Sequence, residues 1–145
     1  MTENIKKAAA QLVSDAEQAR RSRGGHTVVL EKFVEWTEHM ELFGPNAYYI
    51  IFPGLSGNWM LHCIPPSSGS FTQRVPLPKG WAGLPYPELR EVSGIPEVVF
   101  CYADRSIAGA KTKAAALALA EQALEQQFKD ERVEAVRWLR ALFAD

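Results

Sequence analysis

The 145-residue chain is poor in the side chains that usually hold metal ions or carry out cysteine chemistry. It has two cysteines and three histidines, and neither type occurs at the CxxC, HxxxH or HExxH spacing of common metal sites. Its four aspartates are too scattered for a two-metal carboxylate cluster: they are Asp15, Asp104, Asp130 and Asp145. The pattern therefore predicts no metal site, no cofactor and no catalytic residue in this chain.

The chain also lacks an excess of charge of one sign and a long apolar run. Its formal net charge is −1, which argues against a general nucleic-acid binder, although a local basic patch can still bind an anion. No run approaches the roughly 18 apolar residues of a membrane span, and residues 2–21 lack the apolar core of a signal peptide. We therefore expect a cytoplasmic protein with reduced cysteines and no membrane partner. The length fits a single domain, 1–145.

Helical periodicity predicts long helices at both ends of the chain. Residues 3–22 form an amphipathic pattern that stops at Gly24-Gly25, and residues 111–128 are rich in strong helix formers. A break near Asp130 is expected to separate a further amphipathic helix over 129–145. The basic residues of the first helix are expected to form a solvated face or, alternatively, to contact an anionic partner. The predicted buried face of that helix consists of Ile5, Ala8, Ala9, Leu12, Ala16 and Ala19.

Runs of β-branched and aromatic residues predict four strands, over 26–33, 47–53, 59–65 and 98–103. The second run is apolar on both faces, which favours a central position in the sheet. Because the connection between the second and third strands is only a few residues long, we expect the first three strands to form an antiparallel meander. The predicted fold class is α+β, with a mixed or antiparallel sheet of about four strands packed against the long N- and C-terminal helices.

The stretch between the third and fourth strands is rich in proline and glycine. Six prolines between positions 65 and 87 remove backbone donors, so little regular structure is expected there. The stretch is nevertheless too apolar for a free linker, and we predict an ordered loop that packs onto the domain. The side chains expected to anchor it are Phe71, Leu77, Trp81 and Leu84.

The strand, loop and helix start at 98–113 form the strongest candidate for a ligand site. A helix start directs free N–H groups and the positive end of its dipole toward an anion. The alternative is that a hydroxyl only caps the helix and that the lysines are solvated. A Walker P-loop is excluded because Ala110, not glycine, precedes Lys111. The residues within reach of such a site are Arg105, Ser106, Lys111, Thr112 and Lys113.

An ordered set of residues runs through the centre of the chain. It begins with Pro53-x-x-Ser56-Gly57-Asn58-Trp59 and ends with Ile107-x-Gly109-x-Lys111-Thr112. Between them lie Gly69-Ser70-Phe71-x-x-Arg74, Pro76-Leu77-Pro78-x-x-Trp81-x-Gly83-Leu84, Val92-Ser93-Gly94-Ile95-Pro96 and Phe100. This set resembles the C-terminal region of the melanocyte-proliferating-gene family. The N-terminal part is also similar, with an alanine-rich helix followed by Val29-Leu30-x-x-Phe33-x-x-Trp36-x-x-His39, so the resemblance spans about residues 5–125. The last predicted helix lies outside the resemblance.

The resemblance implies a relative of metal-dependent hydrolases of the DHH phosphoesterase superfamily, without the N-terminal domain that carries their catalytic motifs. It further implies a substrate-gripping domain, in a family linked to 3′–5′ RNA exonuclease activity. The family loop resembles Gly-Phe-Ile-Gly-Gly-Asn-Lys-Thr, whereas this chain has Ala108 and Ala110 in place of a glycine and the asparagine. Met60 and Val75 stand where family members often carry a basic residue. These departures predict a weaker phosphate grip.

Three functions are compatible with these residues. The leading hypothesis is a stand-alone, non-catalytic relative of a DHH-family substrate-binding domain that binds RNA, a nucleotide or a separate DHH catalytic protein. Its candidate phosphate ligands are Arg105, Ser106, Gly109, Lys111 and Thr112, with Arg74 assisting. The first alternative is a protein-interaction module that forms a homodimer through exposed apolar helix faces. The second alternative is a metal-dependent phosphodiesterase whose site is assembled differently.

Overall fold

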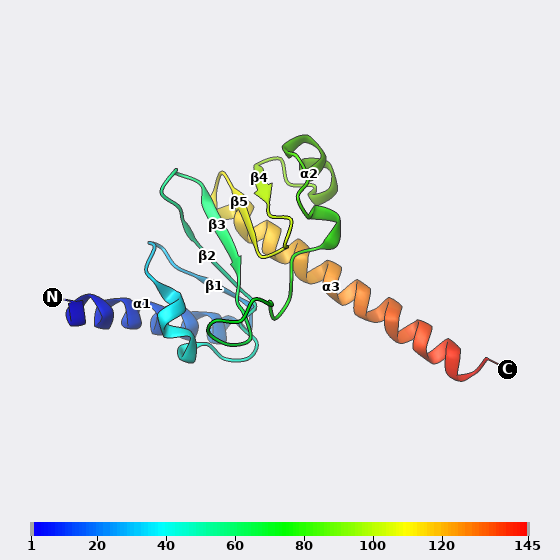
Figure 1. Cartoon of the computed structure of the whole chain (residues 1–145), viewed down its shortest axis with the longest axis horizontal. Helices are drawn as coiled ribbons and strands as arrows, with labels where there is room; N and C mark the ends of the chain where they lie inside the picture. Colours follow the sequence, from blue (N-terminus) through cyan, green and yellow to red (C-terminus); the bar gives the residue numbers. More distant parts are fainter. Residues whose placement is uncertain (1, 145) are drawn as a thin grey trace.

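A computed structural model describes residues 2–144 and confirms the α+β fold class. A mixed five-stranded sheet is flanked by a long helix at each end of the chain (Figure 1). The strand order is β1-β2-β3-β5-β4. The strands are β1 (Thr27–Val29), β2 (Tyr49–Pro53), β3 (Trp59–Cys63), β4 (Val98–Cys101) and β5 (Ile107–Ala110). The helices are α1 (Thr2–Arg23), α2 (Tyr86–Ser93) and α3 (Lys113–Leu142), with short 3₁₀ helices η1 (Trp36–Leu42) and η2 (Lys79–Trp81).

Strand β2 lies inside the sheet and is buried on both faces, as its sequence predicts. Tyr49 and Ile51 point into a core formed with α3, α2 and η2. Ile50 and Phe52 point to the opposite face and pack with α1 and η1. The alternation follows from the two-residue period of an extended strand. The sheet is therefore a shared wall between two apolar cores.

The predicted antiparallel meander is wrong for its first pair of strands. Strand β1 runs parallel to β2, whereas β2 and β3 are antiparallel. The connection from β1 to β2 carries η1 across the α1 face of the sheet before it returns to the starting end. A connection of this length permits the crossover that parallel strands require.

A fifth strand replaces most of the predicted loop after β4. Strand β5 pairs antiparallel with both β3 and β4, and so lies inside the sheet. Its Ile-Ala-Gly-Ala sequence consists mostly of small residues with low strand propensity, so the sequence alone does not predict a strand there.

The predicted helix break near Asp130 is also wrong, because α3 is continuous from Lys113 to Leu142. Asp130 is compatible with the helix interior, where its Oδ1 accepts a hydrogen bond from Gln126 Nε2 at 3.0 Å. The first half of α3 crosses the sheet, and the second half extends away from it (Figure 1). None of the helices formed by residues 2–144 is long and apolar enough to cross a membrane.

The proline-rich loop is ordered by some of the predicted anchors. Leu77 and Trp81 are buried, and Leu84 packs against the same core. Phe71 is 98% exposed, so its predicted packing is wrong.

The buried face of α1 is also rotated from the predicted one. Ala9 is buried as expected, together with Val13, Glu17 and Arg20, while Ile5 is exposed. The apolar residues predict the wrong face because the ion pair of Glu17 and Arg20 occupies part of the buried one.

Candidate anion-binding site

Strand β5 separates most of the candidate phosphate ligands. Because an extended residue advances the chain by about 3.4 Å, Ser106 and Lys111 lie roughly 17 Å apart along the strand. Two candidates precede β5, one lies in it and two follow it: Arg105 and Ser106, then Gly109, then Lys111 and Thr112. The structure therefore does not gather these residues in one loop.

The two candidates that precede β5 make local structural contacts. Arg105 adopts a left-handed backbone with φ of 65°. Its Nε donates to the carbonyl oxygen of Leu77, and its own carbonyl accepts from the Leu77 N–H at 3.0 Å. The N–H and hydroxyl of Ser106 both donate to Asp104 Oδ1, at 3.1 and 2.6 Å. Arg105 thus holds the proline-rich loop, and Ser106 closes the turn into β5.

Gly109 is explained by packing inside the sheet. A Cβ atom at this position would lie 2.3 Å from Cε1 of Phe100, on the neighbouring strand β4. Ala108 and Ala110 are fully buried in the core that contains α3. The resemblance implies that the methyl group of Ala108 lies where a phosphate would approach, and the structure places this methyl group in the core. The glycine and the two alanines are therefore scaffold residues.

The start of α3 retains the features of an anion site. Thr112 is the N-cap, and its Oγ1 accepts a hydrogen bond from the N–H of Ala115 at 3.1 Å. The N–H groups of Lys113 and Ala114 lie in the first helical turn, where no intrahelical acceptor precedes them. Lys111 is exposed just before the cap. Two backbone donors, the helix dipole and flanking lysines therefore meet at one helix end.

An aromatic ring and a carboxylate complete this corner. The Nζ of Lys113 lies 5.9 Å from the centroid of the Trp59 ring and forms an ion pair with Glu31. Trp59 opens β3, whose first residue pairs with the end of β5. The sequence pattern does not identify Glu31, because 82 residues separate it from Lys113. The contact depends on the tertiary fold alone.

A groove of about 740 Å³ opens beside Lys113, between α1, β1 and α3. Its walls include the apolar side chains of Leu12, Val29 and Leu117. The groove also includes three cations and two carboxylates: Arg23, Lys32 and Lys113, with Asp15 and Glu31. The start of α3 therefore adjoins a surface with a small local excess of positive charge.

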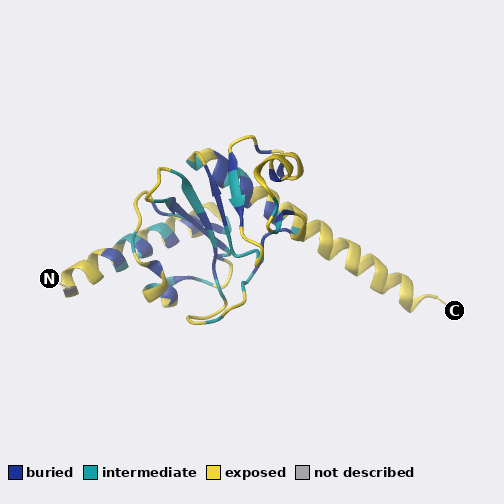
Figure 2. Cartoon of the chain, turned by 45° about the horizontal axis from the view of Figure 1, so that its top comes forward, coloured by how far each residue is buried: buried dark blue, intermediate teal, exposed yellow. Residues whose placement is uncertain are grey.

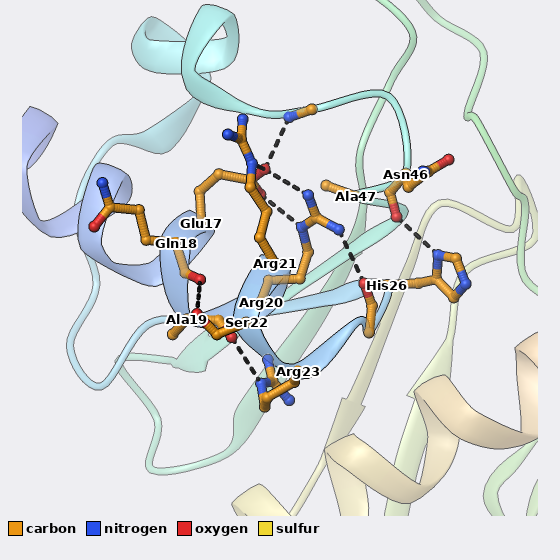
Figure 3. A network of polar contacts seen from close by, with 12 residues as sticks. Glu17, Gln18, Ala19, Arg20, Arg21, Ser22, Arg23, His26, Asn46 and Ala47 are labelled. Atoms are coloured by element: carbon orange, nitrogen blue, oxygen red, sulfur yellow. Dashed lines mark hydrogen bonds and ion pairs between the residues drawn. The ribbon is translucent and has the colours of Figure 1, made fainter.

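A second group of cations surrounds Glu17 near the opposite end of the sheet (Figure 3). Glu17 Oε2 accepts hydrogen bonds from Arg21 Nε at 2.9 Å and from the Gly44 N–H at 3.0 Å. Arg20 contacts both carboxylate oxygens and is buried with Glu17, which is 2% exposed. Burial acts to raise the pKa of Glu17, but hydrogen bonds from Arg20, Gly44 and Arg21 hold that pKa at about 2. The predicted solvated face of the first helix is therefore wrong for Arg20.

Arg74 belongs to this second group and not to the start of α3. Its Nη1 donates to the carbonyl oxygens of Gly44 and Ala47, at 2.6 and 2.9 Å. Burial lowers the pKa of its guanidinium, and the nearby Glu17 carboxylate opposes this effect. Arg74 ties the proline-rich loop to the turn before β2. We refer to Glu17, Arg20, Arg21, Gly44 and Arg74 as the Glu17 corner.

The residues present do not fit the catalytic metal that the family resemblance implies. Within residues 2–144, no three His, Cys, Asp or Glu side chains lie close enough together to hold an ion. His62 packs against Phe52 and Trp36, and burial lowers its pKa to about 4. Burial raises the pKa of the neighbouring Cys63 thiol to about 12, so this thiol stays protonated. We assign no catalytic step to these side chains.

Known proteins align with the region that contains these features. The profile of the uncharacterised protein family UPF0160, MYG1_exonuc, matches residues 1–124. The MYG1 exonuclease of Homo sapiens is 37% identical over 98 residues, which cover 63% of this chain and 26% of the human protein. The MYG1 protein of Dictyostelium discoideum is 32% identical over 127 residues, covering 81% of this chain and 38% of that protein. The chain thus matches only about a quarter to two fifths of these relatives. No solved structure gives a significant match.

Proposed function

Because the chain belongs to the MYG1 family (UPF0160), we propose that it is a non-catalytic relative of a DHH-superfamily substrate-binding domain that binds a phosphate-bearing ligand. The proposed ligand is RNA or a nucleotide, since several relatives are named exonucleases. The proposed site is the start of α3, with Lys111, Thr112 and Lys113. We also propose a separate DHH-type catalytic protein as a partner.

The observation that carries this proposal is the exposed helix start. Its first-turn N–H groups can donate to phosphate oxygens, and the ammonium groups of Lys111 and Lys113 can neutralise them. Trp59 is half-buried beside Lys113, so part of its ring is accessible to a base. A phosphate at this corner would compete with Glu31 for Lys113.

The other candidate ligands take no part in this version of the site. Arg74 and Arg105 donate to backbone carbonyls at the opposite end of the sheet from the start of α3. With only two lysines, we expect weak binding that falls steeply with salt. A single-stranded ligand that contacts two cations should show a slope of log affinity against log salt of about −1.4.

Binding can be measured by fluorescence anisotropy with a labelled single-stranded RNA of about ten nucleotides at low salt. Lys111→Ala should weaken binding about fivefold, since one phosphate contact contributes about 1 kcal/mol. Lys129→Ala is the matched control, because it removes the same charge from an exposed position of α3 that lies about 24 Å from Lys113. Equal losses in both variants, or no RNA or nucleotide binding by the wild type, would refute the proposal.

A further inference from the structure

The second half of α3 projects from the sheet and is exposed on all sides. From Phe128 onward, every residue up to position 144 is exposed (Figure 2). The helix continues about 27 Å beyond Leu124, the last partly buried apolar residue that packs on the core. The match to the MYG1 family ends at the same place, at residue 124. The projection therefore needs an explanation other than the shared fold.

An apolar stripe runs along this projection. At 3.6 residues per turn, its centre occupies an arc of about 60°, on roughly the opposite side of the helix from Leu119, which contacts the sheet. The stripe thus faces away from the protein's own core. The centre of the stripe consists of Phe128, Ala135, Leu139 and Leu142, and Val136, Trp138 and Phe143 flank it. Two charged residues, Glu131 and Arg132, interrupt it within one turn.

The exposed area is large enough for a specific interface. Trp138 alone is 64% exposed, and Phe143 is 84% exposed. The aromatic and aliphatic side chains of the stripe together expose on the order of 600 Å² per chain. Two copies would therefore bury about 1,200 Å², the lower bound for stable protein–protein interfaces.

The charges along the projection favour an antiparallel partner of the same sequence. Residues 130–134 contain three acidic side chains and one arginine, for a net charge of −2. Residues 137–140 contain two arginines, for a net charge of +2. An antiparallel pair centred near Ala135 sets each acidic segment beside a basic one, whereas a parallel pair aligns like charges. Antiparallel helix dipoles favour the same arrangement.

We propose that the segment from Phe128 to Phe143 pairs antiparallel with the same segment of a second copy of this chain. Because the pair has twofold symmetry, the same stripe of both copies forms the contact. The two α3 starts would lie at the outer ends of the helix pair, about 35 Å from its centre. Self-association in this form is independent of the proposed ligand site.

Sedimentation of the full chain from about 1 to about 100 μM covers the range expected for an interface of this size. The wild type should form a dimer, and Leu139→Asp in the stripe should remain a monomer. Val133→Asp is the matched control, because Val133 is exposed on the same helix but lies outside the stripe. Far-ultraviolet circular dichroism and thermal unfolding should confirm that both variants fold. A monomeric wild type, or equal disruption by both variants, would overturn the proposal.

Cross-linking tests the antiparallel order. Oxidation of a mixture of Phe128→Cys and Leu142→Cys chains should give a disulfide-linked heterodimer, and neither variant alone should cross-link. The wild type is the background control, since Cys63 and Cys101 are both buried. Cross-linking of Phe128→Cys with itself would indicate a parallel pair and overturn the proposed arrangement.

Discussion

The two groups of basic residues near opposite ends of the sheet differ in what neutralises them. In the Glu17 corner, Arg20 and Arg74 are held by a buried carboxylate and by backbone carbonyls. At the start of α3, Lys111 is exposed, and the half-buried Lys113 contacts the exposed Glu31 carboxylate and the Trp59 ring. Arg20 and Arg74 are already paired with acceptors of the protein, whereas the two lysines at the start of α3 can exchange their contacts for those of a ligand.

This difference shows why positive charge alone does not locate an anion site. A buried cation with protein acceptors cannot turn to a ligand without leaving those acceptors and the surrounding charges unpaired. An exposed ion pair contributes little to stability, so its lysine can change partner at low cost. Substitutions in the two groups should therefore affect different properties.

The largest expected effect follows from removing the charge of Glu17. Glu17→Gln leaves the buried Arg20 guanidinium without its counter-charge, which should lower the free energy of unfolding by about 3–5 kcal/mol. Urea denaturation measures this loss. Glu3→Gln, on the exposed first turn of the same helix, should change stability by less than about 0.5 kcal/mol. An equally small change in stability for Glu17→Gln would show that the buried ion pair does not hold Arg20 in place.

The pH dependence of stability should carry the signature of the same carboxylate. The folded-state pKa of Glu17 is about 2, below the ordinary value of 4.5. Its contribution is therefore complete above about pH 4.5 and should be lost as the pH falls toward 2, a decrease of about 3 kcal/mol. Urea unfolding of the wild type and Glu17→Gln between pH 2 and pH 6 tests this, and equal pH profiles would contradict the assignment.

A smaller effect should distinguish packing from ligand binding at Gly109. Gly109→Ala places a methyl group against Phe100 and should destabilise the protein by about 1–3 kcal/mol. Combining it with Phe100→Leu should recover part of that loss, since the leucine leaves room for the methyl group. The two substitutions should then show a favourable coupling in a double-mutant cycle. Strictly additive losses would show that Phe100 is not the reason for the glycine.

Much of the fold follows from patterns that are local in the sequence. The apolar run around Ile50 predicts a central strand, and the alanine-rich run after Thr112 predicts a helix. Strand β5 could not be found in this way, because its small residues become strand-like only between β3 and β4. The parallel pairing of β1 depends on a crossover that no local pattern specifies.

The candidate site was only partly predictable, for the same reason. The cap at Thr112 has a local signature, which is a hydroxyl before a run of helix formers. The hydrogen bonds of Glu17 and Arg74 to the turn at Gly44 join segments that are distant in the sequence. Sequence proximity placed Arg105 beside Lys111, and only the intervening strand shows their separation.

The most direct test of the contrast between the two groups applies one substitution to both. Arg74→Met and Lys111→Met each remove one positive charge and keep an unbranched side chain. In RNA titrations at low salt, Lys111→Met should lose about fivefold in affinity, while folded Arg74→Met should stay within about twofold of wild type. Equal losses, or a larger loss for Arg74→Met, would contradict the assignment of the open cations at the start of α3 to ligand binding.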